Sequence, residues 1–212
     1  MNSLQIPRRD IQLENFTYHD LSHQMETLPW YSIAYVNWEE FPYKPEVEFQ
    51  IAHDNQQIFV HYRVEEEFVK AKYVRINEAV WEDSCVEFFL SLDGKSNYYN
   101  IEFNVLGTGL TGYGSQIKED RTRLETEAIA KIQTATTVVN VAGKKKWNII
   151  LVIPSDVFTA DKIDGLAGLT AHANFYKCGD GLPTPHFLSW NKIEHPTPNF
   201  HLPEFFGEVI FE

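Results

Sequence analysis

Polar residues alternate with apolar ones between positions 98 and 105, and this spacing could build a hydrogen-bonding surface. Asn100, Glu102 and Asn104 lie two residues apart, with Ile101 and Phe103 between them. Every second side chain of a strand lies on the same face, so the three polar side chains form a row. Amides donate and accept hydrogen bonds and carboxylates accept them, which suits a ligand with many hydroxyl groups. A solvated surface would show the same pattern.

Residues from two other segments could extend this row into a site. Glu87 alternates with Val86 and Phe88 in the preceding apolar run, so we expect it on the same face as the row. Trp81 stands just before that run, where its ring could stack on the C–H face of a sugar, although tryptophans at such places often pack into a core. Phe200 follows a proline-rich stretch and could supply a second aromatic wall.

Two other classes of function remain open. Glu87 and Glu102 could be the acid and base of a glycoside hydrolase, which needs two carboxyl groups ~5–9 Å apart, as neighbouring strands can place them. Carboxylate pairs are also common on sheets without catalysis. A protein-interaction module with no sugar ligand would instead use Trp30, Trp38 and the tyrosine-rich N-terminal segment.

Alternation with period two predicts that these side chains are carried by strands. The expected strands cover residues 47–51, 58–64, 84–90, 98–105, 131–139, 147–153, 169–176, 187–190 and 208–211. Short helices are expected within 120–130 and at 154–158, and the glycines from Gly107 to Gly114 are interpreted as a tight or bulged turn. The pattern predicts one all-β domain over residues 1–212, an antiparallel β-sandwich of jelly-roll or immunoglobulin type, with residues 1–45 as an irregular N-terminal wrap.

The amino-acid composition limits the classes of binding partner that we expect. The 212 residues include 43% hydrophobic residues, enough for a core, and a formal net charge of −12 argues against nucleic acid and anionic membranes as partners. Cys85 and Cys178 are too few for a disulfide framework and are expected to be buried thiols. No apolar segment follows Arg8 and Arg9, so we expect a cytoplasmic protein. The sequence does not indicate an oligomeric state.

Several segments together resemble a known family. They are VWEDSCVEFFLS, YYNIEFNVLGT, ANFYKCGD, PHFLSWN and PNFHLPEFFGEVIFE. From about Trp30 to the C-terminus, the chain resembles the carbohydrate-binding family 9-like domains of the DOMON-like superfamily, and most closely its stand-alone bacterial members. The resemblance implies a β-sandwich that binds a mono- or oligosaccharide of glucan or xylan type, with its reducing end as one option. It also implies binding without cleavage and a role in polysaccharide catabolism.

The resemblance also assigns residues to a sugar site. Trp81 matches the first of the two tryptophans that hold the sugar in the family, and Glu87 matches a sugar-binding glutamate. Asn104 matches the asparagine of an Arg/Asn pair, whereas Glu102 stands where the arginine would be. Phe200 stands in place of the second tryptophan. A smaller platform and the loss of a guanidinium imply a different sugar or weaker binding.

More distant neighbours of this site are also expected, and they are Trp190, Asn174 and Tyr113. No cofactor is expected, but some members of the family hold structural calcium. The residues of this chain that could bind calcium are Asp83, Asp93 and Asn97, without a complete ligand set.

Overall fold

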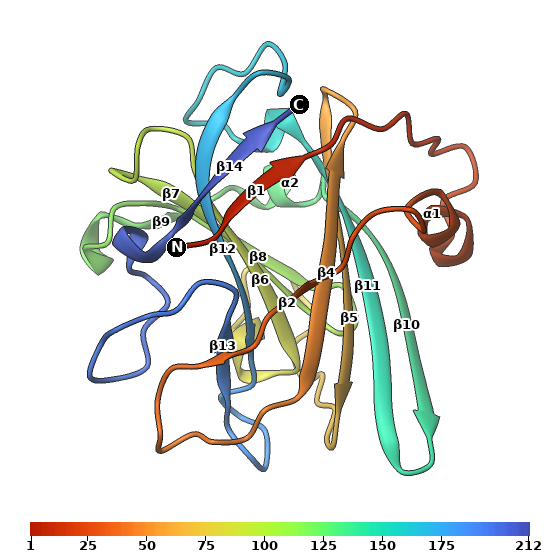
Figure 1. Cartoon of the computed structure of the whole chain (residues 1–212), viewed down its shortest axis with the longest axis vertical. Coiled ribbons are helices and arrows are strands. Elements are labelled where there is room, and N and C mark those ends of the chain that lie inside the picture. Colours follow the sequence, from red (N-terminus) through yellow and green to blue (C-terminus); the bar gives the residue numbers. More distant parts are fainter.

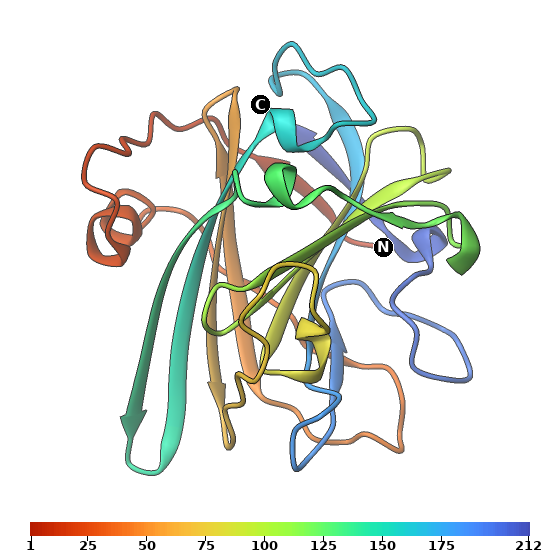
Figure 2. The ribbon, with the colours of Figure 1, turned by 180° about the vertical axis from the view of Figure 1, so that it is seen from behind.

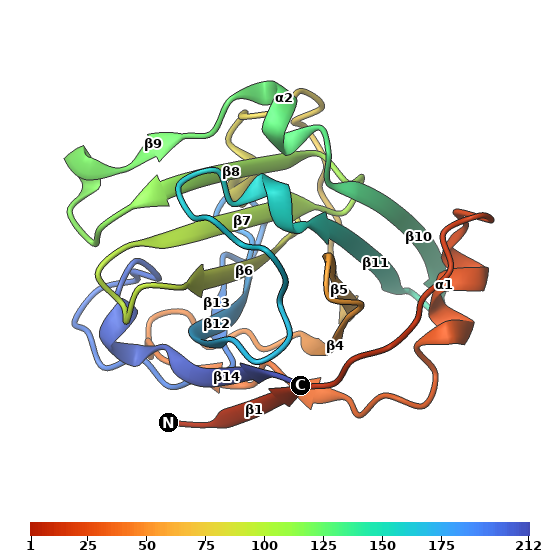
Figure 3. The same cartoon turned by 90° about the horizontal axis from the view of Figure 1, so that it is seen from above.

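The computed structural model describes residues 1–212 and contains two β-sheets that pack against each other (Figure 1 and Figure 3). The larger sheet has nine strands in the order β1-β14-β12-β6-β7-β8-β9, with β13 paired to β12 and β3 paired to β13. The smaller sheet has the order β10-β11-β5-β4-β2. Nearly all pairs are antiparallel, and β1 and β14 are parallel. The predicted β-sandwich is confirmed.

The strands are β1 (Ser3–Ile6), β2 (Tyr31–Ser32), β3 (Tyr35–Val36), β4 (Glu46–His53), β5 (Gln57–Glu66), β6 (Cys85–Ser91), β7 (Tyr98–Asn104), β8 (Gly109–Gly114), β9 (Thr122–Arg123), β10 (Gln133–Val141), β11 (Lys144–Pro154), β12 (Thr170–Cys178), β13 (Phe187–Ser189) and β14 (Gly207–Phe211). The helices are α1 (Tyr18–Gln24) and α2 (Thr126–Ile129), with 3-10 turns η1 (Val80–Glu82), η2 (Lys118–Asp120), η3 (Ser155–Val157) and η4 (Pro203–Phe205). None of the helices has the length and apolar character needed to cross a membrane.

All nine strands expected from alternation are present, and the glycine-rich segment is the main correction. It is not a turn, because residues 109–114 form β8 between β7 and β9. Gly109 packs directly on the ring of Phe103, and a Cβ at Gly112 would lie 2.7 Å from Asn100 Oδ1. Glycine is therefore required here by close packing, which sequence patterns misread as a break in the strand.

The N-terminal segment is more regular than expected. It contains β1, α1, β2 and β3, and each of these strands adds to the edge of a sheet. Helix α1 begins after Thr17, whose hydroxyl oxygen accepts a hydrogen bond from Asp20 N at 3.2 Å. In the 120–130 region the helix is limited to α2, because β9 occupies residues 122–123.

The core lies between the sheets. Phe175 of β12 stacks on Phe49 of β4, with ring centroids 3.8 Å apart, and on Phe88 of β6 at 4.9 Å. Burial of such large side chains stabilises the fold by ~1.5–3 kcal/mol each. The inner faces of both sheets are therefore closed by packing, and any site must use an outer face.

The two outer faces are covered differently. On the smaller sheet, α1 lies against β10 and β11 (Figure 2). Leu21 and Met25 of this segment are fully buried. On the larger sheet, the cover comes from η1, β9 and the loop before η4, and it leaves a cavity. The second arrangement positions the candidate site.

Candidate functional site

A cavity of about 650 Å³ opens on the outer face of the larger sheet. Its floor is built by β6, β7 and β8, and its sides by η1, β9, the end of β12 and the loop around Pro198–His201. It is lined by Trp81, Glu87, Asn100, Glu102, Leu110, Gly112, Gln116, Lys118, Arg121, Thr122, Arg123, Cys178, Asp180, Phe187, Pro198, Asn199, Phe200 and His201. The size suits one or two sugar rings better than a protein segment.

Four residues expected from the sequence line this cavity together. They are Trp81, Glu87, Glu102 and Phe200. Glu87 and Glu102 are direct register partners on β6 and β7, which puts both side chains on the same face. Asn100, a member of the polar row, lines the cavity two residues from Glu102. Alternation on β6 and β7 thus located the floor correctly.

Asn104 ends the row but lies outside the cavity. Its amide nitrogen donates to Asp83 Oδ2 at 3.0 Å and to the backbone oxygen of Tyr73 at 2.8 Å. Its carbonyl oxygen accepts from the backbone nitrogens of Leu106 and Thr108. The side chain is fully buried and fixes the turn between β7 and β8, so its polar groups are already used by the fold.

The three more distant neighbours also lie elsewhere. The Asn174 oxygen accepts from Asn191 N at 2.9 Å and supports the β13 region. Trp190 belongs to the core between the sheets, with its ring edge-on to Phe175. Tyr113 packs on Tyr99 on the inner face of the larger sheet. Trp190 and Tyr113 face the core, whereas Asn174 shares the outer face with Cys178 but lies outside the cavity.

The carboxyl pair on the floor is buried and incompletely hydrogen-bonded. Asn100 Nδ2 donates to Glu102 Oε1 at 2.8 Å, and Cys178 Sγ donates to Glu87 Oε1 at 3.0 Å. Glu102 Oε2 is buried without a partner. Burial raises the pKa of Glu102 to about 7, and burial together with the charge of Glu102 raises the pKa of Glu87 well above its ordinary value. At neutral pH the pair therefore offers both a carboxyl O–H donor and carboxylate acceptors.

Two arginines on β9 and just before it were not anticipated. Arg121 and Arg123 both line the cavity, and the Arg123 guanidinium carbon lies 5.5 Å from the centroid of the Trp81 ring. Arg121 Nη1 donates to Tyr98 Oη at 3.0 Å. The sequence signal that could have found them is their i, i+2 spacing around Thr122, which puts both side chains on one face of an extended segment. The cavity is thus lined by two guanidinium groups from β9 and the residue before it.

A chain of hydrogen bonds fixes the ring nitrogens of His201. Tyr98 Oη lies 2.9 Å from His201 Nδ1 and already accepts from Arg121. The arrangement in which Tyr98 donates its proton to Nδ1 gives every group of this chain a partner, and it leaves Nε2 of His201 as an N–H donor. Burial, with the positive charge of Arg121, lowers the pKa of His201 to about 3, so the ring is neutral.

The aromatic walls are held in place from behind. The Phe200 ring stacks on Tyr176 at 4.2 Å with an interplanar angle of 10°, and only 8% of the residue is exposed. The backbone oxygen of Trp81 accepts from Asp180 N at 3.2 Å, which ties η1 to the end of β12. Trp81 itself is half-buried. The cavity therefore has one fixed aromatic side and one partly exposed aromatic side.

The residues considered for calcium do not fit that ion. Both Asp83 oxygens accept from backbone N–H groups, Oδ1 from Lys72 and Oδ2 from Tyr73. Asp93 accepts from the backbone and the side chain of Asn97 within its own turn. These N–H bonds compete with a cation for the carboxylate oxygens, and Asn97 directs a donor rather than an acceptor toward Asp93.

Comparisons with known proteins place this geometry in context. The model of the family described as carbohydrate-binding family 9 matches residues 18–211. A protein of Bacteroides uniformis ATCC 8492, provisionally named carbohydrate-binding, is 36% identical with a TM-score of 0.92, and the match covers 100% of this chain and 99% of that chain.

Two structures of a family 9 module from Caldicellulosiruptor kristjanssonii also match. The complex with glucose has a TM-score of 0.60 at 11% identity and covers 100% of this chain and 96% of that chain. The complex with cellotriose has a TM-score of 0.61 at 11% identity and covers 100% and 94%. At this identity the match shows the shared fold. No curated protein matches the chain.

Proposed function

Because the chain belongs to carbohydrate-binding family 9, we propose that its cavity binds a mono- or oligosaccharide of the glucan or xylan type without cleaving it. The observation that carries the proposal is the placing of two aromatic walls, Trp81 and Phe200, around a buried carboxyl pair with one oxygen free of hydrogen bonds. The ligand class is supported by the glucose and cellotriose complexes of the Caldicellulosiruptor module.

Stacking would hold the apolar face of the sugar. A pyranose ring has C–H groups on its faces, and these pack on aromatic rings. Trp81 is half-buried, so part of its indole remains free for this contact. Phe200 is fixed by Tyr176 and presents a smaller surface than a tryptophan would. We expect Trp81 to contribute more to affinity than Phe200.

Hydrogen bonds would orient the sugar hydroxyl groups. Glu102 Oε2 has no partner within the chain, so a sugar hydroxyl that donates to it removes the penalty of ~1–3 kcal/mol for an unsatisfied buried group. The guanidinium groups of Arg121 and Arg123 line the side of the cavity at β9, and they add donors for the ring oxygen or the hydroxyl oxygens of a sugar. A sugar hydroxyl group can donate to a carboxylate oxygen on the floor of the cavity and accept from a guanidinium group at its side.

Isothermal titration calorimetry tests the proposal directly. Glucose, xylose, cellobiose and xylobiose are titrated into the purified chain, together with cellobiitol, whose reducing end has been converted to an alcohol. We expect one site per chain for at least one of the four reducing sugars. Weaker binding of cellobiitol than of cellobiose would show recognition of the reducing end.

Matched variants locate the binding. Glu102→Gln removes a carboxylate of the floor and should weaken binding, whereas Glu208→Gln changes an exposed glutamate on β14 of the same sheet and should not. No heat and no change in thermal stability with any of the sugars would refute the proposal. Turnover of aryl glycosides that disappears in Glu102→Gln would show a hydrolase instead.

A further inference from the structure

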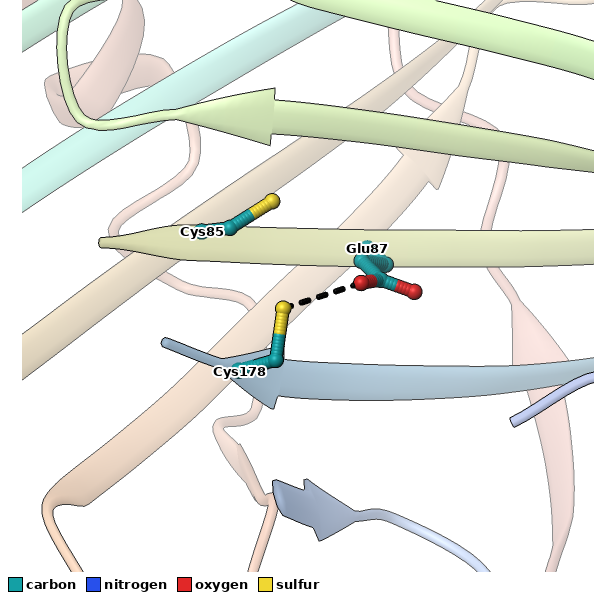
Figure 4. Close-up of side chains that lie close together, drawn as sticks. All are labelled: Cys85, Glu87 and Cys178. Atoms are coloured by element: carbon teal, nitrogen blue, oxygen red, sulfur yellow. Dashed lines mark hydrogen bonds between the residues drawn. The ribbon is translucent and has the colours of Figure 1, made fainter. Parts of the chain in front are cut away.

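Three side chains with metal-binding atoms meet on the floor of the cavity. Cys85 and Cys178 are register partners on β6 and β12, and Glu87 lies two residues beyond Cys85 on the same face. One ligand atom from each residue lies within 4.8 Å of the other two. Figure 4 shows Cys178 and Glu87 facing each other across the gap between the two strands, with Cys178 Sγ 3.0 Å from Glu87 Oε1.

The cavity gives this cluster access to solvent. Glu87 and Cys178 both line it, so an ion that enters the cavity meets two of the three ligands, and the fully buried Cys85 lies within 4.8 Å of both. A second, independent feature lies beside this cluster. Glu102 lies directly opposite Glu87, is 5% exposed, and has its Oε2 buried without a hydrogen-bond partner. A buried carboxylate oxygen with no donor is unusual in a folded protein, and at this place it favours a cation nearby.

We propose that Cys85, Cys178 and Glu87 bind a divalent cation of the Zn²⁺ class at the floor of the cavity, with water from the cavity as the fourth ligand. Two thiolates select a borderline-soft ion over Ca²⁺ or Mg²⁺, which require oxygen ligands. Tetrahedral Zn–S bonds of ~2.3 Å put the two sulfurs about 3.8 Å apart, and the ligand atoms of the three residues already lie within 4.8 Å of one another.

Binding exchanges protons for the ion and transfers no electrons. Burial raises the pKa of Cys85 to about 12 and that of Cys178 well above its ordinary value, so both thiols are protonated without a cation. The incoming ion takes the place of the two thiol protons and of the Glu87 carboxyl proton, which pass to solvent. Affinity for the ion should therefore rise with pH. The site needs no sugar, so it can be tested even if no sugar binds.

Cobalt is the probe, because thiolate ligands give it a sulfur-to-metal charge-transfer band. The chain is kept reduced without oxygen and titrated with Co²⁺, then with Zn²⁺. We expect the band to saturate at one equivalent, to disappear when one equivalent of Zn²⁺ displaces the cobalt, and to be unaffected by Ca²⁺ or Mg²⁺. A Zn²⁺-dependent rise in the midpoint of thermal unfolding is the second readout.

Variants separate this site from surface binding. Cys85→Ser and Cys178→Ser should each abolish the band, and Glu87→Gln should weaken Co²⁺ binding at least tenfold. His19→Gln/His23→Gln is the control, because these residues lie four apart on α1 and can chelate ions by themselves. That double variant should keep the full band. Absence of the band in the reduced wild type, or its retention in Cys178→Ser, would overturn the proposal.

Discussion

The molecule buries carboxyl groups in two places and treats them in opposite ways. Glu66 lies between the sheets, 2% exposed, with Oε1 accepting from Trp147 Nε1 at 2.7 Å and Oε2 at 3.0 Å from the ammonium of Lys177. Glu87 and Glu102 lie on the outer face of the larger sheet, 3% and 5% exposed. Neither of them forms an ion pair.

The difference separates a structural site from a binding site. At Glu66 the countercharge is built into β12, and Lys177 also donates to Cys178 O and contacts His186, so little is left for a ligand. At the carboxyl pair no ion pair supplies a countercharge, and the charge is reduced by raised pKa values. Burial alone therefore does not identify a functional carboxylate, and the lack of an internal cation at the carboxyl pair is what supports its proposed binding role.

The largest effect is expected at the Glu66 site. Lys177→Met leaves the Glu66 charge buried without its partner, which destabilises proteins by ~3–5 kcal/mol. Urea unfolding measures this loss, and sugar affinity at low temperature should be retained. The double variant Glu66→Gln/Lys177→Met removes both charges and should recover most of the stability. A loss below ~1 kcal/mol for the single variant would show that the pair is not structural.

The second effect is a pH dependence of stability that comes from the carboxyl pair. The Glu102 pKa is about 7 in the folded chain against an ordinary value of 4.5, with burial as the main cause, so the folded state holds more protons between these values. Stability should therefore fall as pH rises from 5 to 8, by up to roughly 3 kcal/mol. Unfolding midpoints at several pH values measure the fall.

Glu102→Gln is the variant that tests the origin of this slope. The glutamine side chain has no carboxyl proton to lose, so the variant should show a flatter pH dependence and equal or greater stability at pH 8. Glu208→Gln, at an exposed position of the same sheet, should leave the slope unchanged. Equal slopes in the wild type and in Glu102→Gln would contradict the raised pKa.

The third effect contrasts the outer faces of the two sheets. Trp81→Ala should lower sugar affinity ~10- to 100-fold, because the indole supplies the stacking surface. Trp30→Ala is a matched control: Trp30 is also half-buried, and the Arg63 guanidinium lies 3.9 Å from its ring centroid. Calorimetry should show no change for Trp30→Ala. Equal losses in both variants would mean that stability, rather than stacking, sets the affinity.

The sequence predicts local features of the fold and the site better than features that depend on distant contacts. Alternation located nine strands, and it placed Glu87 and Glu102 on one face, because side-chain direction within a strand has a fixed period. It missed β8, since glycine has low strand propensity and its use here depends on Phe103 and Asn100. It assigned Asn104 to the ligand, because the need of the following turn for hydrogen bonds is visible only in the structure.

Arg121 and Arg123 were also missed by the sequence analysis, because their place at the cavity depends on distant contacts. Arg123 leads to the smallest predicted effect. Arg123 reaches the cavity only because Gly112, its register partner on β8, lets β9 come close. Its charge opposes the effect of burial on the Glu102 pKa. Arg123→Gln should therefore raise that pKa further and move the pH-dependent fall in stability to higher pH. It should also weaken sugar binding by only ~3- to 10-fold, since an exposed guanidinium contributes about 1 kcal/mol.

Arg63→Gln is the control for this last effect, because Arg63 also lies over a tryptophan but on the other sheet. That variant should keep the sugar affinity, measured by calorimetry at pH 7, and the Glu102 transition, measured by unfolding at several pH values. If Arg123→Gln left the Glu102 transition at the same pH, its guanidinium would not act on the carboxyl pair. Burial alone would then set the charge of the carboxyl pair, and no cationic side chain would act on it, unlike Glu66 with its Lys177 partner.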